Sequence, residues 1–301
     1  MLANNCQVDV MRFIQAILLS IAYFITFVLI SMPFLFLWLR HAKTVHPEIV
    51  GGPIEQLPIE IISAAGAFVA VWLLGLKFKS VRLHDLGLGH RQGMLFAIVG
   101  AAIGICLVAG TLGTLYSLGI LTFNPDYRFE FSFEFVALAA GVVANVFAQQ
   151  IIFFGYILTV VRKKTSSIVA LPTVALLFLG AHAGVFTQLW PVSAIGAANL
   201  FLAGLMLSLA HLRSKTLWMG IGLHSGWNLS QALSGLAVTG QSIGVGAPPF
   251  ILEGPAALTG GSIGIEASLI SIPYVLAGIM IVALMFRAKQ TDAEAVAAHG
   301  P

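Results

Sequence analysis

Five side chains that could do chemistry interrupt long apolar stretches of the sequence: Gln149, Gln150, His182, His224 and Asn228. A neutral imidazole can accept a proton near physiological pH, and an amide or imidazole N–H can donate a hydrogen bond to developing negative charge. Inside a bilayer such polar groups are costly unless they are paired or hydrated, so each one is a candidate for a functional site. The sequence therefore predicts a site for acid–base and hydrogen-bond chemistry within the apolar stretches.

Four of these side chains are expected at a similar depth in membrane-spanning helices. Counted at about 1.5 Å per residue from the predicted cytoplasmic helix ends, Gln149 lies at roughly 18 Å and His182 at roughly 22 Å. On the same count Asn228 lies at roughly 20 Å and His224 at roughly 14 Å. His224 and Asn228 are four residues apart and so share one helix face. We predict that three helices bring these groups together.

A structural role stays open as an alternative, in which each polar group hydrogen-bonds to a neighbouring helix. Asn145, one helical turn before Gln149, and Asn199 are expected to have this role, because a lone Asn in an apolar helix usually links helices. His211 lies beside Arg213 at an expected helix end, so we predict an interfacial position for it.

The elements that would position the polar groups are membrane-spanning helices. Of the 301 residues, 58% are hydrophobic and 9% are charged, whereas a soluble domain carries about 25% charged residues. The apolar runs have the length of about 18 residues or more that a helix needs to cross ~30 Å of hydrocarbon. Barrel strands would be about ten residues long and would alternate in polarity. The predicted fold class is all-α, a polytopic membrane helix bundle of about eight transmembrane helices.

Hydropathy predicts a single transmembrane domain over residues 1–290, followed by a tail at 291–301 that we expect to be disordered. The predicted spans are 13–39, 59–78, 93–119, 134–161, 167–189, 193–212, 216–238 and 267–287. The first span is too long for a signal-peptide core and is interpreted as a retained helix.

Small residues recur at helical spacing in two of these spans. Gly100-x-x-x-Gly104 and Gly222-x-x-x-Gly226 have the spacing that lets helices approach closely. The sequence has 31 glycines, so such spacings also arise by chance.

The distribution of positive charge predicts the orientation. With eight spans, 12 of the 15 Lys and Arg residues fall on one side, and only Arg40, Lys43 and Arg128 fall on the other. By the positive-inside rule, both termini are then cytoplasmic in a multi-pass protein of a cell membrane. The basic residues form no patch with interleaved aromatic residues, so we expect the lipid bilayer and no nucleic acid as a partner.

Two of the polar groups belong to short motifs, Phe178-x-x-x-His182 and His224-x-x-x-Asn228. In order and spacing these motifs are similar to the second and third motifs of the CPBP family of intramembrane proteases. This family is also called the CAAX-protease and bacteriocin-processing family.

The first motif of that family, Glu-Glu-x-x-x-Arg, resembles the segment Gln149-Gln150-Ile-Ile-Phe-Phe154. Two short segments are also similar to family segments: one begins at Asp85, before the third span, and the other ends at Trp218, before the third motif. The resemblance therefore covers a core of about residues 80–238.

The resemblance implies proteolysis of a prenylated or membrane-embedded peptide, and it implies a bacterial inner membrane. In the family, a first-motif glutamate activates a water with help from the second-motif histidine, the position of His182. The third-motif residues, here His224 and Asn228, stabilise the oxyanion. We expect Phe154 and Phe178 to contact the substrate.

The first motif departs from the family pattern, because Gln149 and Gln150 replace both glutamates and Phe154 replaces the arginine. A glutamine amide can orient a water but cannot accept its proton near neutral pH. Proton transfer typically contributes about 10²–10⁴-fold to a rate. The sequence therefore predicts impaired catalysis.

No other carboxylate is expected to substitute. The chain has no Asp or Glu between Glu134 and Glu253, and Glu134 lies 15 residues before the first motif. Glu60, Glu130 and Glu266, like Glu253, are predicted near the outer face.

No metal or other cofactor is expected. Two histidines with amide neighbours make a poor zinc site, because amides are weak ligands. Cys6 and Cys106 are a hundred residues apart and suggest neither a disulfide framework nor a metal site.

Three functions remain open. The first is a protein with the CPBP fold that has lost most peptidase activity and binds a membrane peptide or protein. The second is an active intramembrane endopeptidase with His182 as the substitute base. The third is a transporter that uses the polar groups as a solute site, against which the scarcity of charged residues in the spans argues.

Overall fold

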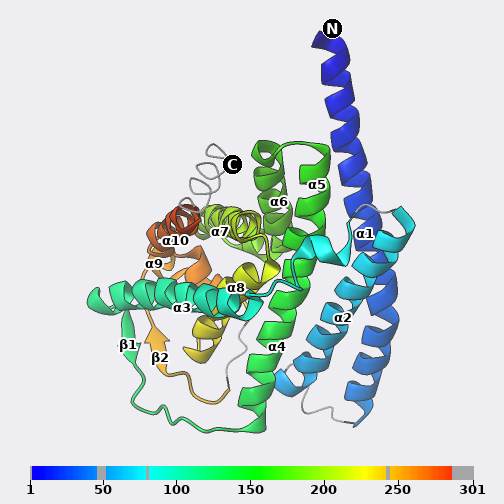
Figure 1. Ribbon diagram of the computed structural model, residues 1–301. Coiled ribbons are helices and arrows are strands. Elements are labelled where there is room, and N and C mark those ends of the chain that lie inside the picture. Colours follow the sequence, from blue (N-terminus) through cyan, green and yellow to red (C-terminus); the bar gives the residue numbers. More distant parts are fainter. Residues whose placement is uncertain (1, 46–51, 79–80, 242–244, 287–301) are drawn as a thin grey trace.

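The computed structural model describes residues 2–45, 52–78, 81–241 and 245–286 (Figure 1). Helices account for most of this part of the chain. The α-helices are α1 (Leu2–Val45), α2 (Pro53–Phe78), α3 (Gly93–Ser117), α4 (Phe133–Gln149), α5 (Leu158–Lys164), α6 (Ser167–Ala181), α7 (Val192–Ser214), α8 (Leu217–Leu233), α9 (Ala256–Thr259) and α10 (Ser271–Met285). A π-helix, η3 (Gln150–Ile157), joins α4 to α5, and 3-10 turns are present at η2 (Leu83–Leu86), η4 (Ala183–Thr187), η5 (Gly261–Ile263) and η6 (Ile265–Ala267).

Each predicted span contains a helix of the structure: α1, α2, α3, the continuous α4–η3–α5, α6, α7, α8 and α10. Within the described part of the chain, five stretches are long and apolar enough to cross a membrane: Asp9–Thr44, Pro53–Gly75, Gly93–Ser117, Phe133–Lys164 and Val192–Ser214. α6 and α10 are shorter apolar helices. The predicted fold class, an all-α membrane helix bundle, is confirmed. The predicted tail at 291–301 lies outside the described residues, and the single-domain division stays a prediction.

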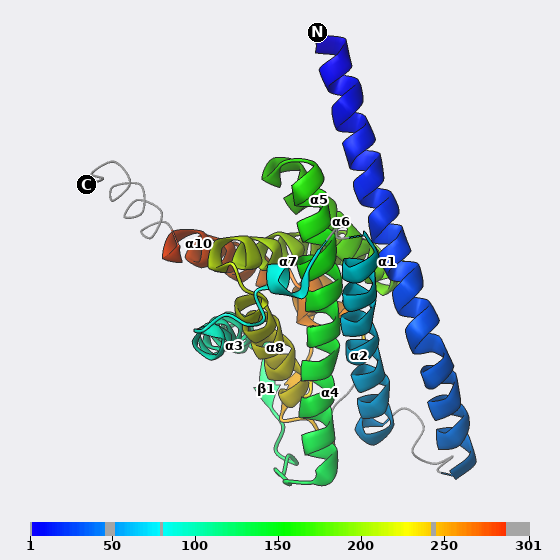
Figure 2. The same ribbon diagram turned by 45° about the vertical axis from the view of Figure 1, so that its right-hand side comes forward.

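The helices do not all run in one direction. α1, α2 and the α4–α5 helix run alongside one another, while α7 lies across them in both views and α3 lies across them in Figure 1 (Figures 1 and 2). α4 also extends further down than α2 in both views. A depth counted along each helix from a common membrane edge is therefore a poor guide to which side chains meet.

α3 and α8 cross at the glycines of the two predicted small-residue motifs. A Cβ atom at Gly100 or Gly104 would lie 2.3 Å from a carbonyl oxygen of α8. A Cβ atom at Gly222 or Gly226 would lie 2.0 or 2.4 Å from a carbonyl oxygen of α3. Only residues without a side chain allow this backbone approach, so the interpretation of these spacings as a helix contact is confirmed.

The glycine contact also fixes which way α8 faces. His224 is two residues from both Gly222 and Gly226, which is about 200° around an α-helix. Asn228, two residues after Gly226, is turned away from α3 in the same way. The face of α8 opposite α3 is therefore the polar one.

Two family-like segments meet at the start of α8. The Thr216 hydroxyl donates to the carbonyl of Gly87 at 2.8 Å, and the Trp218 indole N–H donates to the carbonyl of Leu88 at 2.7 Å. The Thr216 Oγ1 also accepts from the Trp218 backbone N–H at 3.2 Å and so caps the helix. These bonds connect the segment before α3 to α8.

The α4–α5 helix changes its winding directly after Gln149. All eight residues of the π-helix η3 are buried. π-helical turns inside α-helices are uncommon and occur frequently at functional sites. Neither this turn nor the short antiparallel pair β1 (Leu121–Phe123) and β2 (Phe250–Leu252), with Leu121 opposite Leu252, was predicted from the sequence.

Candidate functional site

His182 lies where α6 ends. Its backbone dihedrals, φ −101° and ψ 43°, leave the helical region, and the 3-10 turn η4 follows. Its Nδ1 atom lies 2.7 Å from the carbonyl oxygen of Phe178. A carbonyl can only accept, so Nδ1 carries the hydrogen and Nε2 of the neutral ring is an acceptor. The sequence placed His182 within a longer span, whereas the structure places it at the end of the helix.

His224 on α8 contacts the buried amide of Gln150. The Gln150 Nε2 lies 3.4 Å from the His224 Nδ1. An amide nitrogen only donates, so Nδ1 accepts and the neutral ring carries its hydrogen on Nε2. Gly220 leaves the space for this amide, since a Cβ atom there would lie 2.4 Å from the Gln150 Oε1. The Nε2 of His182 is thus a hydrogen-bond acceptor, whereas the Nε2–H of His224 is a donor.

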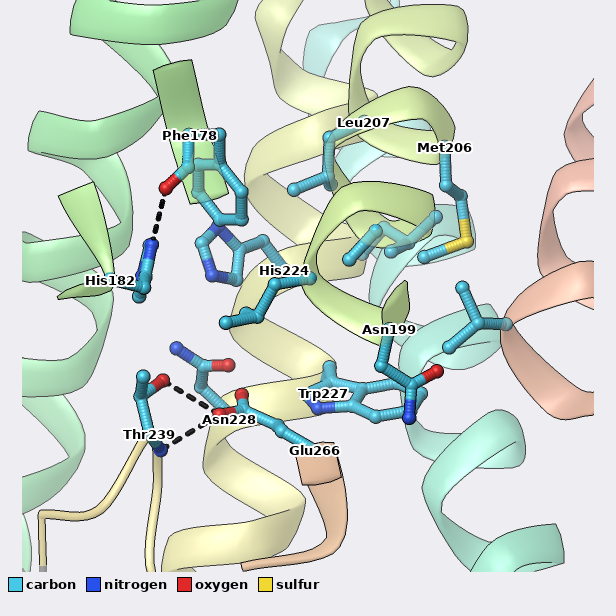
Figure 3. Close-up of a pocket in the computed structure, with 14 residues that line it drawn as sticks. Phe178, His182, Asn199, Met206, Leu207, His224, Trp227, Asn228, Thr239 and Glu266 are labelled. Atoms are coloured by element: carbon cyan, nitrogen blue, oxygen red, sulfur yellow. Dashed lines mark hydrogen bonds between the residues drawn. The ribbon is translucent and has the colours of Figure 1, made fainter. Parts of the chain in front are cut away.

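Asn228 lies one helical turn after His224. Figure 3 shows its side chain below the two histidines and beside Thr239. Its Oδ1 atom is buried and has no hydrogen-bond partner among the described residues. An unpaired buried polar atom costs about 1–3 kcal/mol, so a bound ligand or water would find an acceptor here.

Gln149 belongs to a chain of side-chain hydrogen bonds that crosses from α4 to α2. The Gln149 Nε2 donates to the Asn145 Oδ1 at 2.6 Å, and the Asn145 Nδ2 donates to the Glu60 Oε2 at 2.8 Å. The chain ends at a carboxylate. Asn145 therefore connects helices, as predicted, and it also connects Gln149 to a charged group.

Two cavities meet at the polar groups. The larger one, of about 580 Å³, is lined by Glu60, Gln149, His182, Asn228 and parts of α2, α4 and the segment 238–241. The smaller one, of about 40 Å³, is lined mainly by apolar side chains together with His182, His224 and Asn228. Both are bordered by His182, Asn228 and Thr239. The predicted convergence of groups from α4, α6 and α8 is present in the structure.

The two predicted aromatic contacts are both buried, and of the two only Phe178 lines one of the cavities. Phe178 lines the smaller cavity, and its ring centroid lies 4.4 Å from that of His182 and 6.0 Å from that of His224. Phe154 is fully buried and packs against Phe178, with ring centroids 5.4 Å apart. Phe154 would therefore act on a substrate through Phe178, and the substrate role of both residues stays a prediction.

The expectation that other carboxylates lie away from these groups is wrong for Glu60 and Glu266. Glu60 lines the larger cavity with Gln149 and His182, and Glu266 lines the smaller one with His224. α2 begins at Pro53, so Glu60 lies two turns inside the helix instead of at its end. A proline at the first helical position was the signal that could have placed this start. Glu266 comes from a loop with 3-10 turns, for which the sequence offers no comparable signal.

Asn199, which lines the smaller cavity, donates from Nδ2 to the Ser268 carbonyl at 3.1 Å, in keeping with a structural role. Within the described ranges, no group of three or more His, Cys, Asp or Glu side chains is arranged to hold a metal ion. Two histidines with amide neighbours also make a poor zinc site, because amides are weak ligands.

Comparison with protein families gives one match. Residues 131–230 match the family model described as type II CAAX prenyl endopeptidase Rce1-like. This stretch, the CAAX-endopeptidase-like segment, is similar to that family. The match confirms the resemblance that the three motifs predicted. No curated protein matches the chain.

The CAAX-endopeptidase-like segment contains all three motifs, from Gln149 to Asn228. Glu60 and Glu266 lie outside it. The polar groups of this site therefore come partly from the family segment and partly from elements before and after it.

Proposed function

We propose that this multi-pass membrane protein is an intramembrane endopeptidase that binds a membrane peptide in the larger cavity and hydrolyses it there. One observation carries the proposal: a cavity of about 580 Å³ brings His182, Asn228 and the carboxylate of Glu60 to the same space. Proton acceptors and hydrogen-bond donors that face one cavity are the groups that peptide hydrolysis needs. The family match supports the same general activity.

The opposite tautomers of the two histidines support separate roles. The Nε2 atom of His182 can accept a hydrogen bond from a water, while the Nε2–H of His224 can donate to a carbonyl oxygen that becomes negative. The amide N–H groups of Asn228 supply a second donor on the same helix face. The proposal includes a prenylated or membrane-embedded peptide as substrate and the predicted orientation with cytoplasmic termini.

A second candidate is a protein that binds the peptide without cleaving it. It is favoured by the first motif, in which Gln149, Gln150 and Phe154 replace two acids and an arginine. The triple substitution Gln149→Glu, Gln150→Glu and Phe154→Arg tests this candidate. If the native chain only binds, the triple variant should cleave peptides that the native chain leaves intact.

The first experiment incubates the purified protein in detergent with a quenched prenylated peptide and a pool of short membrane peptides. We expect cleavage by the native chain, and a loss of about 10²–10⁴-fold in turnover for His182→Ala. His84→Ala, a change at an exposed histidine away from the cavity, is the matched control and should keep full turnover. A native chain that cleaves none of these peptides would contradict the proposal.

A further inference from the structure

The Glu60 carboxylate differs from the other polar groups around the larger cavity in its unused hydrogen-bonding capacity. Its Oε2 accepts from the Asn145 Nδ2 at 2.8 Å. Its Oε1 has no hydrogen-bond partner among the described residues and does not belong to their buried unpaired atoms. Glu60 is half-buried and borders the cavity. One carboxylate oxygen is thus held in place and the other is available to a water in the cavity.

Among the described residues, no other side chain at the site is both charged and free to accept a hydrogen bond from water. Gln149 and Gln150 cannot accept a proton near neutral pH. The Glu266 carboxylate accepts three hydrogen bonds, from the Gln231 Nε2 at 3.2 Å, the Thr239 N–H at 2.8 Å and the Thr239 hydroxyl at 2.6 Å. Both of its oxygens therefore already accept hydrogen bonds from the protein itself.

The hydrogen-bond chain shows how Glu60 takes part in the family-like site. Gln149 occupies the position of the family's first glutamate, and its amide is two hydrogen bonds away from the Glu60 carboxylate. The intervening Asn145 donates to Glu60 and accepts from Gln149, so both its amide atoms are used. On α4, Gln149 lacks the negative charge of the family's glutamate, while Glu60 on α2 supplies a negative charge that faces the same cavity.

We propose that Glu60 is the catalytic base of this site, a carboxylate supplied by α2 in place of the acid missing from α4. The inference rests on the proposed endopeptidase function and names the residue that takes the proton. In this arrangement, His182 orients the attacking water through Nε2.

The reaction then balances with water as the only co-reactant. The Glu60 Oε1 takes a proton from water, whose oxygen forms a bond to the peptide carbonyl carbon while the π pair moves to the carbonyl oxygen. His224 and Asn228 donate hydrogen bonds to that oxyanion. When the C=O bond re-forms, the C–N bond breaks and Glu60 returns its proton to the leaving nitrogen. The products are a carboxylic acid and an amine, and Glu60 is again a carboxylate.

The test is Glu60→Gln in the full chain, assayed with the quenched prenylated peptide and the membrane-peptide pool. Turnover should fall by about 10²–10⁴-fold, because the amide cannot take the proton. The acid limb of the kcat/KM profile, which reports the free enzyme's base, should disappear. Glu134→Gln, which removes an exposed carboxylate at the start of α4, is the control. It should leave turnover and the acid limb of the kcat/KM profile unchanged.

A second variant moves the carboxylate back to α4. Gln149→Glu in the Glu60→Gln background should restore turnover to within about tenfold of the native chain, because proton transfer again has a carboxylate acceptor beside Asn145. Thermal unfolding in the same detergent checks that each variant is folded.

The outcomes separate the two proposals. If the native chain cleaves a peptide and Glu60→Gln cleaves it equally well, Glu60 is not the base and the endopeptidase function stands. If Glu60→Gln is inactive and Gln149→Glu does not restore turnover in a folded protein, Glu60 has a role other than proton transfer, and the inference fails. If thermal unfolding shows that the native chain is folded and it still cleaves none of the peptides, the endopeptidase function and the inference fail together.

Discussion

Glu60 and Glu266 are two carboxylates outside the family-like segment, and each lines a cavity that His182 and Asn228 also border. Among the residues that the structure describes, Glu60 has one hydrogen-bond partner, Asn145, and it faces a cavity of about 580 Å³. Glu266 is buried and accepts three hydrogen bonds from two residues at the ends of the segment 231–239. Figure 3 shows two of these bonds, between Glu266 and Thr239, below Asn228.

The two carboxylates differ in how many hydrogen bonds they accept from the protein, so the position of an acidic side chain near a site does not decide its role. A carboxylate whose oxygens are all bonded within the protein stabilises the fold, because removing it leaves buried donors unpaired. A carboxylate with an oxygen directed to a water-sized space can take a proton. We therefore expect substitutions at Glu60 to change turnover and substitutions at Glu266 to change stability.

The largest expected effect on stability is that of Glu266→Ala. It would leave the Gln231 amide, the Thr239 N–H and the Thr239 hydroxyl without their acceptor, at about 1–3 kcal/mol for each unpaired buried group. The free energy of unfolding should fall by about 3 kcal/mol or more, measured by thermal unfolding in detergent. Glu60→Ala is the matched control, since water in the cavity can replace its single bond. Equal destabilisation by both substitutions would remove the distinction between the two carboxylates.

A smaller effect is expected where α8 contacts α3, on the face opposite His224. In Gly226→Ala the new Cβ would lie 2.4 Å from the Ala101 carbonyl oxygen, so the helices must move apart. Overpacking of this kind costs about 1–3 kcal/mol. Gly113→Ala on α3 is the control, because its Cβ meets nothing within 4 Å among the described residues. A stability loss as large for Gly113→Ala would show that the effect is not due to the helix contact.

The sequence predicted those parts of the molecule that depend on one helix at a time. The spacing of His224 and Asn228, the glycines of α3 and α8, and the order of the helices follow from periodicity and hydropathy. The link from Gln149 through Asn145 to Glu60 did not follow. It depends on the level at which α2 begins relative to α4, and on the π-helical turn after Gln149, which are properties of how helices pack. Glu60 was placed at a membrane edge because the start of α2 was predicted at residue 59 instead of at Pro53.

The smallest effect is expected at a third carboxylate, Asp85, which pairs with Lys163 at the end of α5 with a nitrogen–oxygen distance of 2.6 Å. Burial alone would raise the pKa of the Asp85 carboxyl, but the hydrogen bonds from Lys163 and from the Arg82 N–H, with the nearby positive charge, lower the pKa below its ordinary value. A lowered folded-state pKa stabilises the protein above the ordinary carboxyl pKa, and this contribution is lost as the pH falls through the folded value.

Asp85→Asn should therefore reduce the free energy of unfolding at neutral pH by less than about 1 kcal/mol, because both side chains are partly exposed to solvent. The difference from the native chain should disappear on acidification below the folded-state pKa of Asp85. Thermal unfolding at a series of pH values measures the stability loss at neutral pH and its disappearance in acid. Asp126→Asn, a change at an exposed residue, is the control. A difference that persists in acid would mean that Asp85 acts through its backbone hydrogen bond and not through its charge. Turnover should be unaffected, because Asp85 borders neither cavity. Like Glu266, Asp85 is expected to stabilise the fold, since its carboxylate is bonded within the protein.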